Sequence, residues 1–261
     1  MRIEDFMNFD TDRKGTGTAE WAEVTENICR GCPNNCLYCY AAYNANRFKH
    51  RPRPEWDHEE LTKRAIMTSY PTREGVVMFP SSHDITPFNL EAYIRIARMI
   101  LAKGNRLLIV SKPRIECITA LLTEFEQWKS QILFRFTIGT MNEVAAYLWE
   151  PGAPTPQERA ACLQDAFDSG YRTSISIEPL LGGIDNAIDV VRALRYMVTD
   201  TIWIGKMNKV RLRVSGEHAK AIENIEFLQR DEKILELYRY FENDPIIRWK
   251  DSIKEVLARA L

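Results

Sequence analysis

Four of the six cysteines in the chain lie between Cys29 and Cys39, and the last three have a spacing that could do chemistry. Cys32, Cys36 and Cys39 follow the pattern C-x3-C-x2-C. Three thiolates on one tight loop can each bind one iron of a cubane iron–sulfur cluster. The fourth iron then has no protein ligand and is open to a small molecule. The spacing therefore predicts a [4Fe–4S] cluster with one free coordination site.

Cys29 adds an alternative, because four thiolates could instead form a structural zinc site. Zinc ribbons usually separate their two CxxC pairs by roughly 15–20 residues, whereas three residues separate the pairs here. A zinc- or cluster-bearing module that only binds nucleic acid is the non-enzymatic hypothesis. Cys117 and Cys162 stand alone on predicted helices and are expected to pack in the core.

Short apolar runs alternate with amphipathic stretches, a pattern typical of parallel strands separated by helices. The expected strands are about 23–28, 76–79, 107–110, 132–138, 173–177 and 202–204. The expected helices are 90–103, 115–129, 154–169 and 188–197, followed by a mostly helical C-terminus interrupted at 243–245. We predict an α/β fold, a partial (β/α)6 TIM-type barrel with C-terminal helices. One domain would span 1–261, with the barrel core at about 21–206 and the helical extension at about 216–261.

Composition and charge restrict the classes of function that the chain could have. The chain has 261 residues, 45% of them hydrophobic and 27% charged, which is ordinary for a globular protein. Its net charge of −1 excludes a global field that attracts nucleic acid or membrane. No run of 18 apolar residues predicts a membrane span, and the polar N-terminus lacks the apolar core of a signal peptide. We therefore expect a cytoplasmic protein with reduced thiols.

Polar residues follow every predicted strand from the second to the sixth, and in such barrels the chemistry lies at the carboxyl ends of the strands. Any one of them could simply belong to a solvated turn. Glu178 follows a strand of strongly apolar alternation and should therefore lie inside the mouth of the barrel. The candidates for catalytic or substrate contacts are His83, Asp84 and Lys206, and those for cofactor contacts are Ser82, Lys112, Thr137 and Glu178.

The cysteine segment resembles the signature of the radical S-adenosylmethionine (SAM) superfamily, which favours an aromatic residue before the last cysteine. Tyr38 stands at that place. The resemblance implies that SAM chelates the open iron and that an electron from the cluster breaks a carbon–sulfur bond of SAM. A 5′-deoxyadenosyl radical would then abstract hydrogen from the substrate. The backbone of Tyr38 would contact the adenine. The Gly-Gly-Glu motif found after the second strand in many members is absent here, and Ser81, Ser82 and Asp84 are candidates to replace it.

A narrower set of motifs is similar to the spore photoproduct lyase-like branch, over roughly residues 23 to 206. These motifs are Ser-Ser-His-Asp from Ser81, Ser-Lys-Pro from Ser111, Thr-Ile-Gly-Thr from Thr137 and Trp-Glu-Pro-Gly from Trp149. The resemblance implies that Lys112, Ser82 and Thr137 contact SAM. The photoproduct lyases carry a hydrogen-donating cysteine after the second strand, where this chain has Ser81 and Ser82. A serine hydroxyl is a far poorer hydrogen-atom donor, so the resemblance does not by itself imply DNA repair.

Two basic groups should lie near the mouth of the barrel. One contains Arg47, Lys49, His50, Arg51 and Arg53, and the other contains Lys206, Lys209, Arg211 and Arg213. A basic rim could bind a phosphate-bearing or nucleic-acid substrate, or an acidic reductant such as flavodoxin or ferredoxin. It could equally be a solvated charged face. A radical modifier of peptides or proteins is the second enzymatic hypothesis, although the cysteine-rich C-terminal domain of many such enzymes is absent.

Overall fold

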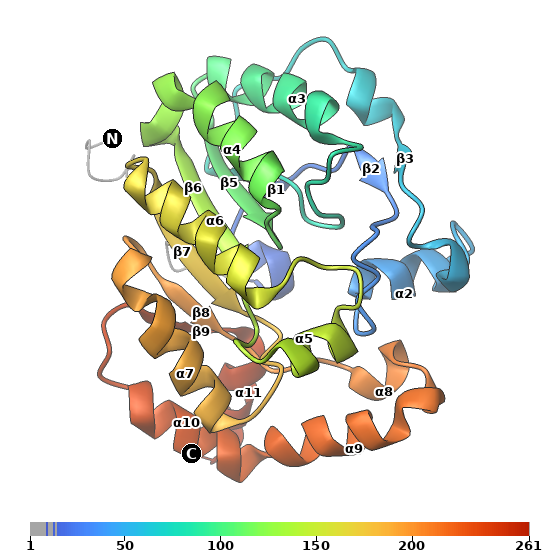
Figure 1. The fold of residues 1–261 in the computed structure, drawn as a ribbon, viewed down its shortest axis with the longest axis vertical. Helices are drawn as coiled ribbons and strands as arrows, with labels where there is room; N and C mark the ends of the chain where they lie inside the picture. Colours follow the sequence, from blue (N-terminus) through green and yellow to red (C-terminus); the bar gives the residue numbers. More distant parts are fainter. Residues whose placement is uncertain (1–8, 10–12, 14, 261) are drawn as a thin grey trace.

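The structure is a computed structural model that describes residues 9, 13 and 15–260. Within these residues, seven parallel strands form one sheet in the order β1-β4-β5-β6-β7-β8-β9. The order across the sheet follows the chain, and the sheet curls into an open half-barrel (Figure 1). The predicted α/β partial barrel is therefore confirmed. The strands are β1 (Val24–Thr25), β4 (Val76–Met78), β5 (Arg106–Ser111), β6 (Ile132–Thr137), β7 (Arg172–Ile177), β8 (Ile202–Ile204) and β9 (Ile247–Trp249).

Helices cover the outer face of the sheet because one side of each is apolar. In α3, for example, Ile96, Ala97 and Ile100 are buried. The covering helices are α3 (Leu90–Ala102), α4 (Ile115–Glu124), α6 (Pro156–Asp168), α7 (Ile184–Leu194) and α10 (Asp231–Phe241). Short 3₁₀ turns join several elements: η2 (Arg53–Glu55), η3 (Lys63–Ile66), η4 (Glu126–Gln131), η5 (Arg195–Met197) and η6 (Gly216–His218).

The remaining elements surround one end of the half-barrel, where the parallel strands have their carboxyl ends (Figure 1). They are η1 (Gly17–Glu20), α2 (Tyr40–Arg47), α5 (Glu143–Trp149), α8 (Val210–Arg213), α9 (Ala219–Leu228) and α11 (Asp251–Ala260). A small antiparallel ribbon of β2 (Cys29–Arg30) and β3 (Glu60–Leu61) stands apart from the main sheet.

The C-terminal region differs from the sequence prediction, because it supplies β9 to the sheet as well as helices. The strand pairs in parallel with β8, with Ile202 opposite Ile247. The run Ile247–Trp249 has only three residues, which is too short for its periodicity to separate a strand from a helix or a loop. The predicted helical extension at 216–261 therefore completes the barrel sheet.

The interior of the half-barrel is filled by side chains and is no open channel. Arg135 on β6 is fully buried. Its Nε donates to Ser174 Oγ at 2.9 Å, and its guanidinium lies 5.0 Å from the Trp21 ring and 5.4 Å from the Trp203 ring. The two indole rings therefore hold a buried cation by cation–π attraction.

The N-terminal and C-terminal parts of the described chain meet beside the carboxyl ends of the strands. The Gly17 N–H donates to Asp251 Oδ2 at 3.1 Å, and the Asp251 N–H donates to Glu20 Oε1 at 3.0 Å. Lys250 is 1% exposed, and its Nζ lies 2.6 Å from Glu20 Oε2. We call this set of contacts the terminal seam. It fastens η1 to the end of β9.

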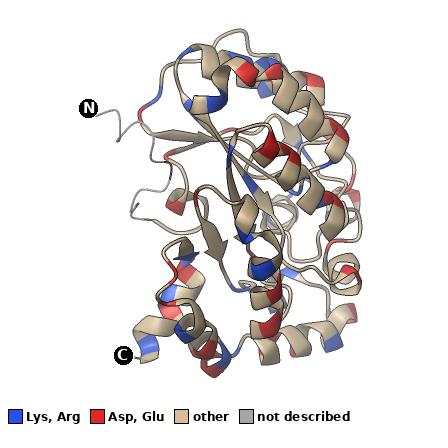
Figure 2. Cartoon of the chain, turned by 60° about the vertical axis from the view of Figure 1, so that its left-hand side comes forward, with Lys and Arg blue, Asp and Glu red and all other residues tan. Residues whose placement is uncertain are grey.

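Charged residues of both signs are interspersed over the outer helices (Figure 2). This distribution agrees with the net charge of −1. Within the described part of the chain, no helix has both the length and the apolar character needed to cross a bilayer.

Candidate functional site

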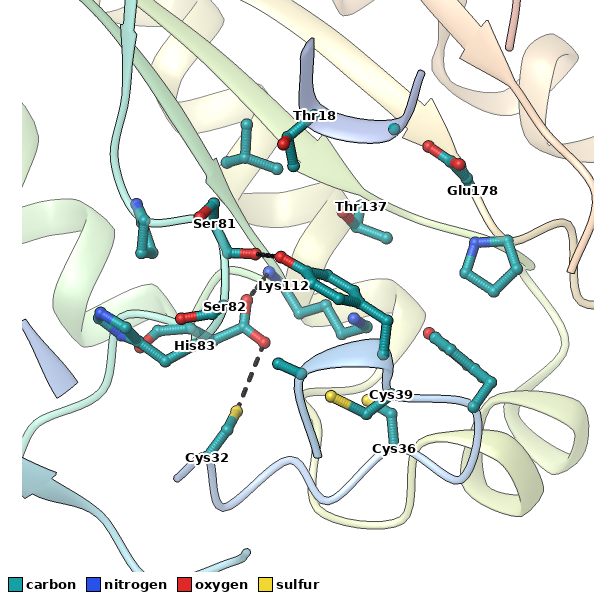
Figure 3. A pocket seen from close by; sticks show the side chains of 18 of the residues that line it. Thr18, Cys32, Cys36, Cys39, Ser81, Ser82, His83, Lys112, Thr137 and Glu178 are labelled. Atoms are coloured by element: carbon teal, nitrogen blue, oxygen red, sulfur yellow. Dashed lines mark hydrogen bonds between the residues drawn. The ribbon is translucent and has the colours of Figure 1, made fainter. Parts of the chain in front are cut away.

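A cavity of about 440 Å³ opens at the carboxyl ends of the strands. The cysteine sulfurs lie on one side of it, and Thr18 and Glu178 lie on the opposite side (Figure 3). Every site residue predicted from the sequence lines this cavity. The set comprises Cys32, Cys36, Tyr38, Cys39, Ser82, His83, Asp84, Lys112, Thr137, Glu178 and Lys206. The structure thus brings together residues that are up to 174 positions apart in the chain (206 − 32), while their individual roles stay predictions.

The cysteine loop is fixed by backbone contacts. The Cys32 N–H donates to the Trp56 carbonyl at 2.7 Å, and the Cys39 N–H donates to the Cys36 carbonyl at 3.1 Å. Cys39 is the N-cap of α2, and its Sγ accepts from the Ala42 N–H at 3.4 Å. The first turn of α2 thus fixes the position of the Cys39 sulfur.

The segment after α5 lies directly against the cysteine loop. The Leu37 N–H donates to the Trp149 carbonyl at 2.9 Å, and the Gly152 N–H donates to the Asn34 carbonyl at 3.2 Å. A Cβ at Gly152 would lie 2.0 Å from the Pro33 carbonyl oxygen. Only glycine allows the two backbones to approach this closely.

The donor set of the three thiols fits an iron–sulfur cluster. Among the described residues, no three His, Cys, Asp or Glu side chains converge on a point that one metal ion would occupy. A cubane takes one thiolate at each of three separate irons, and the three cysteines share the wall of one cavity. Burial raises the pKa of the Cys36 thiol to about 12, against the opposing effect of Lys112. Cluster binding must therefore displace the thiol protons.

Cys29 does not belong to this cavity wall. It lies in the β2–β3 ribbon opposite Leu61, and its Sγ lies 3.8 Å from Glu59 Oε1. Burial and the neighbouring Glu59 carboxylate raise the pKa of the Cys29 thiol to about 12. The four-thiolate zinc hypothesis would need Cys29 beside the other three, and the structure places it elsewhere.

Asp84 and Lys112 lie next to the cysteines. Asp84 accepts from the Lys112 N–H at 2.6 Å and from Ser111 Oγ at 2.9 Å. The Cys32 Sγ lies 3.7 Å from Asp84 Oδ2. Burial opposes the charge on Asp84, but the Lys112 ammonium and these hydrogen bonds outweigh burial and lower its pKa. A fixed carboxylate thus stands within contact distance of one of the three thiols.

A buried ion network supports the floor of the cavity. Glu150 is buried, and its Oε2 lies 2.6 Å from Arg159 Nη2. The Lys112 Nζ lies 3.8 Å from Glu150 Oε1, and the Tyr38 hydroxyl donates to the same oxygen. Burial opposes the charge on Lys112, but Cys36 and Glu150 outweigh it and raise its pKa. Lys112 therefore carries a positive charge at the cavity wall.

The loop after β4 is organised by Asn27, which the sequence analysis did not single out. The Asn27 Oδ1 accepts from the backbone N–H of Ser81 at 2.9 Å and of Ser82 at 2.8 Å. His83 is buried, and its Nε2 accepts from the Ile28 N–H at 3.2 Å while its Nδ1 lies 3.0 Å from the Asp84 carbonyl. Both ring nitrogens of His83 thus contact backbone groups, which favours a positioning role.

Glu178 lies in the mouth of the barrel, as its place after β7 predicts. Its side chain is 22% exposed, and its Oε2 lies 3.6 Å from Lys250 Nζ. Burial raises the pKa of Glu178 to about 7, although Lys250 pulls in the opposite direction. Lys206 also lines the cavity, and its Nζ lies 3.4 Å from Asp231 Oδ1.

Several further lining residues escaped the sequence reasoning, and Tyr40, Thr18 and Lys250 are three of them. The Tyr40 hydroxyl donates to the Ser81 carbonyl at 2.5 Å. Thr18 and Lys250 enter from the terminal seam. Tyr40 follows the last cysteine and could have been noticed for that reason, whereas nothing near Thr18 or Lys250 in the sequence signals a site.

No protein-family model matches the sequence. An uncharacterized protein, ORF301, of the Acidianus two-tailed virus is 27% identical over 217 residues, which cover 77% of this chain and 70% of the viral protein. Among solved structures, spore photoproduct lyase complexed with dinucleoside spore photoproduct superposes with a TM-score of 0.58 and 17% identity, covering 87% of this chain and 76% of the lyase.

The chain has the fold of spore photoproduct lyase. A mutant of that enzyme with bound AdoMet and dinucleoside spore photoproduct matches with a TM-score of 0.57 at 16% identity over the same shares of both chains. The likeness in fold to spore photoproduct lyase agrees with the branch whose motifs the sequence resembles.

Proposed function

We propose that the protein is a radical SAM enzyme that holds one [4Fe–4S] cluster on Cys32, Cys36 and Cys39. The observation that carries this proposal is the position of the three thiols, which share one cavity at the carboxyl ends of the parallel strands. When bound, the cluster and SAM would together supply a 5′-deoxyadenosyl radical. A solved structure with this fold contains AdoMet beside its substrate.

The residues of the chain have separable tasks in this proposal. Lys112 carries a buried positive charge beside Cys36 and is suited to hold the SAM carboxylate. Ser82, Thr137 and the Tyr38 backbone are the other proposed SAM contacts. Glu178 faces the same cavity and could accept hydrogen bonds from ribose hydroxyls.

The substrate would enter from the mouth of the cavity, where Lys206 is a proposed contact. Of the other two predicted contacts, Asp84 lies beside the cysteines and His83 is suited to a positioning role. Asp84 is held as a carboxylate by Lys112, and Lys206 contributes a positive charge at the rim. A phosphate-bearing or nucleic-acid substrate is compatible with this rim. A small reductant protein, such as flavodoxin or ferredoxin, would supply the electron.

The test is anaerobic reconstitution with iron and sulfide, followed by dithionite and SAM. We expect a brown protein that forms 5′-deoxyadenosine, detected by chromatography. A colourless protein that binds one zinc and leaves SAM intact would refute the proposal.

A further inference from the structure

The short helix α8 carries two arginines whose surroundings differ. Arg211 is exposed, and its Nη2 lies 2.5 Å from Glu226 Oε2. It lines a second, more open hollow of about 400 Å³ beside α9. Arg213 is half-buried and lines the cavity that holds the cysteines. Two residues of the same type on one helical turn therefore face different environments.

Arg213 differs from the lysines of the cavity in having no counter-ion among the residues that the structure describes. Among the described lining residues, Lys112 pairs with Glu150, Lys206 with Asp231 and Lys250 with Glu20. No described carboxylate lies within ion-pair distance of Arg213, and no described group accepts a hydrogen bond from it. A guanidinium that is partly withdrawn from water has a desolvation cost that a bound anion would offset.

The neighbours of Arg213 place it near Cys39 and Glu178 in the cavity. Burial lowers the pKa of Arg213, and the nearby Cys39 and Glu178 partly oppose this effect. In Figure 1, α8 lies below α2, whose first turn carries Tyr40. Lys112 enters the cavity from the end of β5, and it is already the proposed partner of the SAM carboxylate. Arg213 is therefore available to bind a ligand other than the SAM carboxylate.

We propose that Arg213 binds an oxyanion, either a phosphate or a carboxylate, that the substrate of this cavity carries. This assignment rests on the proposed function, because it takes the cavity to be the substrate site. The planar fork of a guanidinium matches both oxyanions through two parallel hydrogen bonds. The anionic group of the substrate would then lie beside Cys39, and a neutral analogue of the substrate would bind weakly.

The test uses inorganic pyrophosphate as the probe and calorimetric titration of the anaerobically reconstituted protein in the presence of saturating SAM. We expect Arg213→Gln to weaken pyrophosphate binding by about tenfold or more, because a two-bond charged contact is lost. Arg213→Lys should have an intermediate affinity, since it keeps the charge but loses the fork. Arg211→Gln is the matched control and should bind pyrophosphate like the wild type.

Equal losses in Arg211→Gln and Arg213→Gln would overturn the proposal, because they would show a diffuse basic field. Wild-type protein that binds no pyrophosphate would also overturn it. So would competition between SAM and pyrophosphate, because Arg213 would then serve the cofactor. Iron content and thermal unfolding of each variant show whether it is folded. Formation of 5′-deoxyadenosine is measured separately. It distinguishes a failure of the radical SAM proposal from a failure of the Arg213 proposal.

Discussion

The Gly152 N–H donates to the Asn34 carbonyl at 3.2 Å, so that the segment after α5 lies directly on the cysteine loop. The contact joins the turn between α5 and α6, within the connection from β6 to β7, to a loop more than a hundred positions earlier in the chain. It couples the position of the three thiols to the packing of the barrel. The shape of the proposed cluster site therefore depends on a residue that contributes no side chain.

Gly152→Ala should disturb the cysteine loop. The new methyl would lie 2.0 Å from the Pro33 carbonyl oxygen, so that one of the two backbones must move. We expect a loss of about 1–3 kcal/mol in the free energy of unfolding, and less iron bound after reconstitution. Gly216→Ala is the control, because its Cβ would meet nothing within 4 Å. Denaturant unfolding and iron analysis give the two readouts, and equal behaviour of both variants would contradict this account.

Cys36→Ala should abolish cluster binding, whereas Cys29→Ala should retain it. The Cys36 thiol lines the cavity, and the Cys29 thiol lies beside Glu59 in the β2–β3 ribbon. Iron and sulfide content after anaerobic reconstitution measures the difference, together with formation of 5′-deoxyadenosine. If loss of Cys29 removed the metal as completely as loss of Cys36, a four-thiolate site would have to be reconsidered.

Glu150→Gln should destabilise the protein strongly. The substitution leaves Arg159, which is 2% exposed, without its carboxylate partner at 2.6 Å. Breaking a buried ion pair in this way costs about 3–5 kcal/mol. Glu226→Gln removes the exposed partner of Arg211 and should cost less than about 1 kcal/mol. Urea titrations of the two variants side by side would show the contrast, and a mild effect of Glu150→Gln would contradict the buried network.

Glu178 should make stability depend on pH around neutrality. Its pKa is raised from 4.5 to about 7 in the folded state, so the folded protein binds more protons than the unfolded chain between these values. The stabilisation of the folded state by proton binding at Glu178 is present in full below pH 4.5 and is lost as pH rises through about 7. Across this pH range, the free energy of unfolding of the wild type should fall by on the order of 1–3 kcal/mol relative to that of Glu178→Gln.

Measuring the free energy of unfolding of both proteins from acid to neutral pH checks this sign. A wild type that gains stability relative to Glu178→Gln as pH rises would show that Lys250 outweighs burial. Glu178 would then be a permanent carboxylate in the cavity.

The sequence was sufficient to predict the half-barrel because the short runs that form β5 and β6 are mostly apolar, the run that forms β7 alternates polar with apolar residues, and amphipathic helices separate the three. It also placed Asp84, Lys112 and Glu178 correctly in one cavity, because the carboxyl ends of parallel strands meet at one edge of a sheet. These predictions depend only on local patterns and on one topological rule.

What the sequence did not reveal depends on contacts between distant segments. The strand β9 is three residues long, and only its pairing with β8 distinguishes it from a loop. Glu150 stood in a recognised motif, but its burial against Arg159 follows from how α6 packs on β6. Lys250 and Thr18 reach the cavity through the terminal seam, and no periodicity near either residue signals this.

The terminal seam also bears on the order of events during synthesis. The cysteine loop is complete once residue 39 has been made, but the wall that includes Gly17 and Lys250 needs residues from both sides of the seam. A chain that is still being translated can therefore leave one wall of this cavity open until the residues of β9 and Lys250 have been made. If the proposed cluster is inserted in that interval, the later pairing of β9 with β8 would close the cavity behind it.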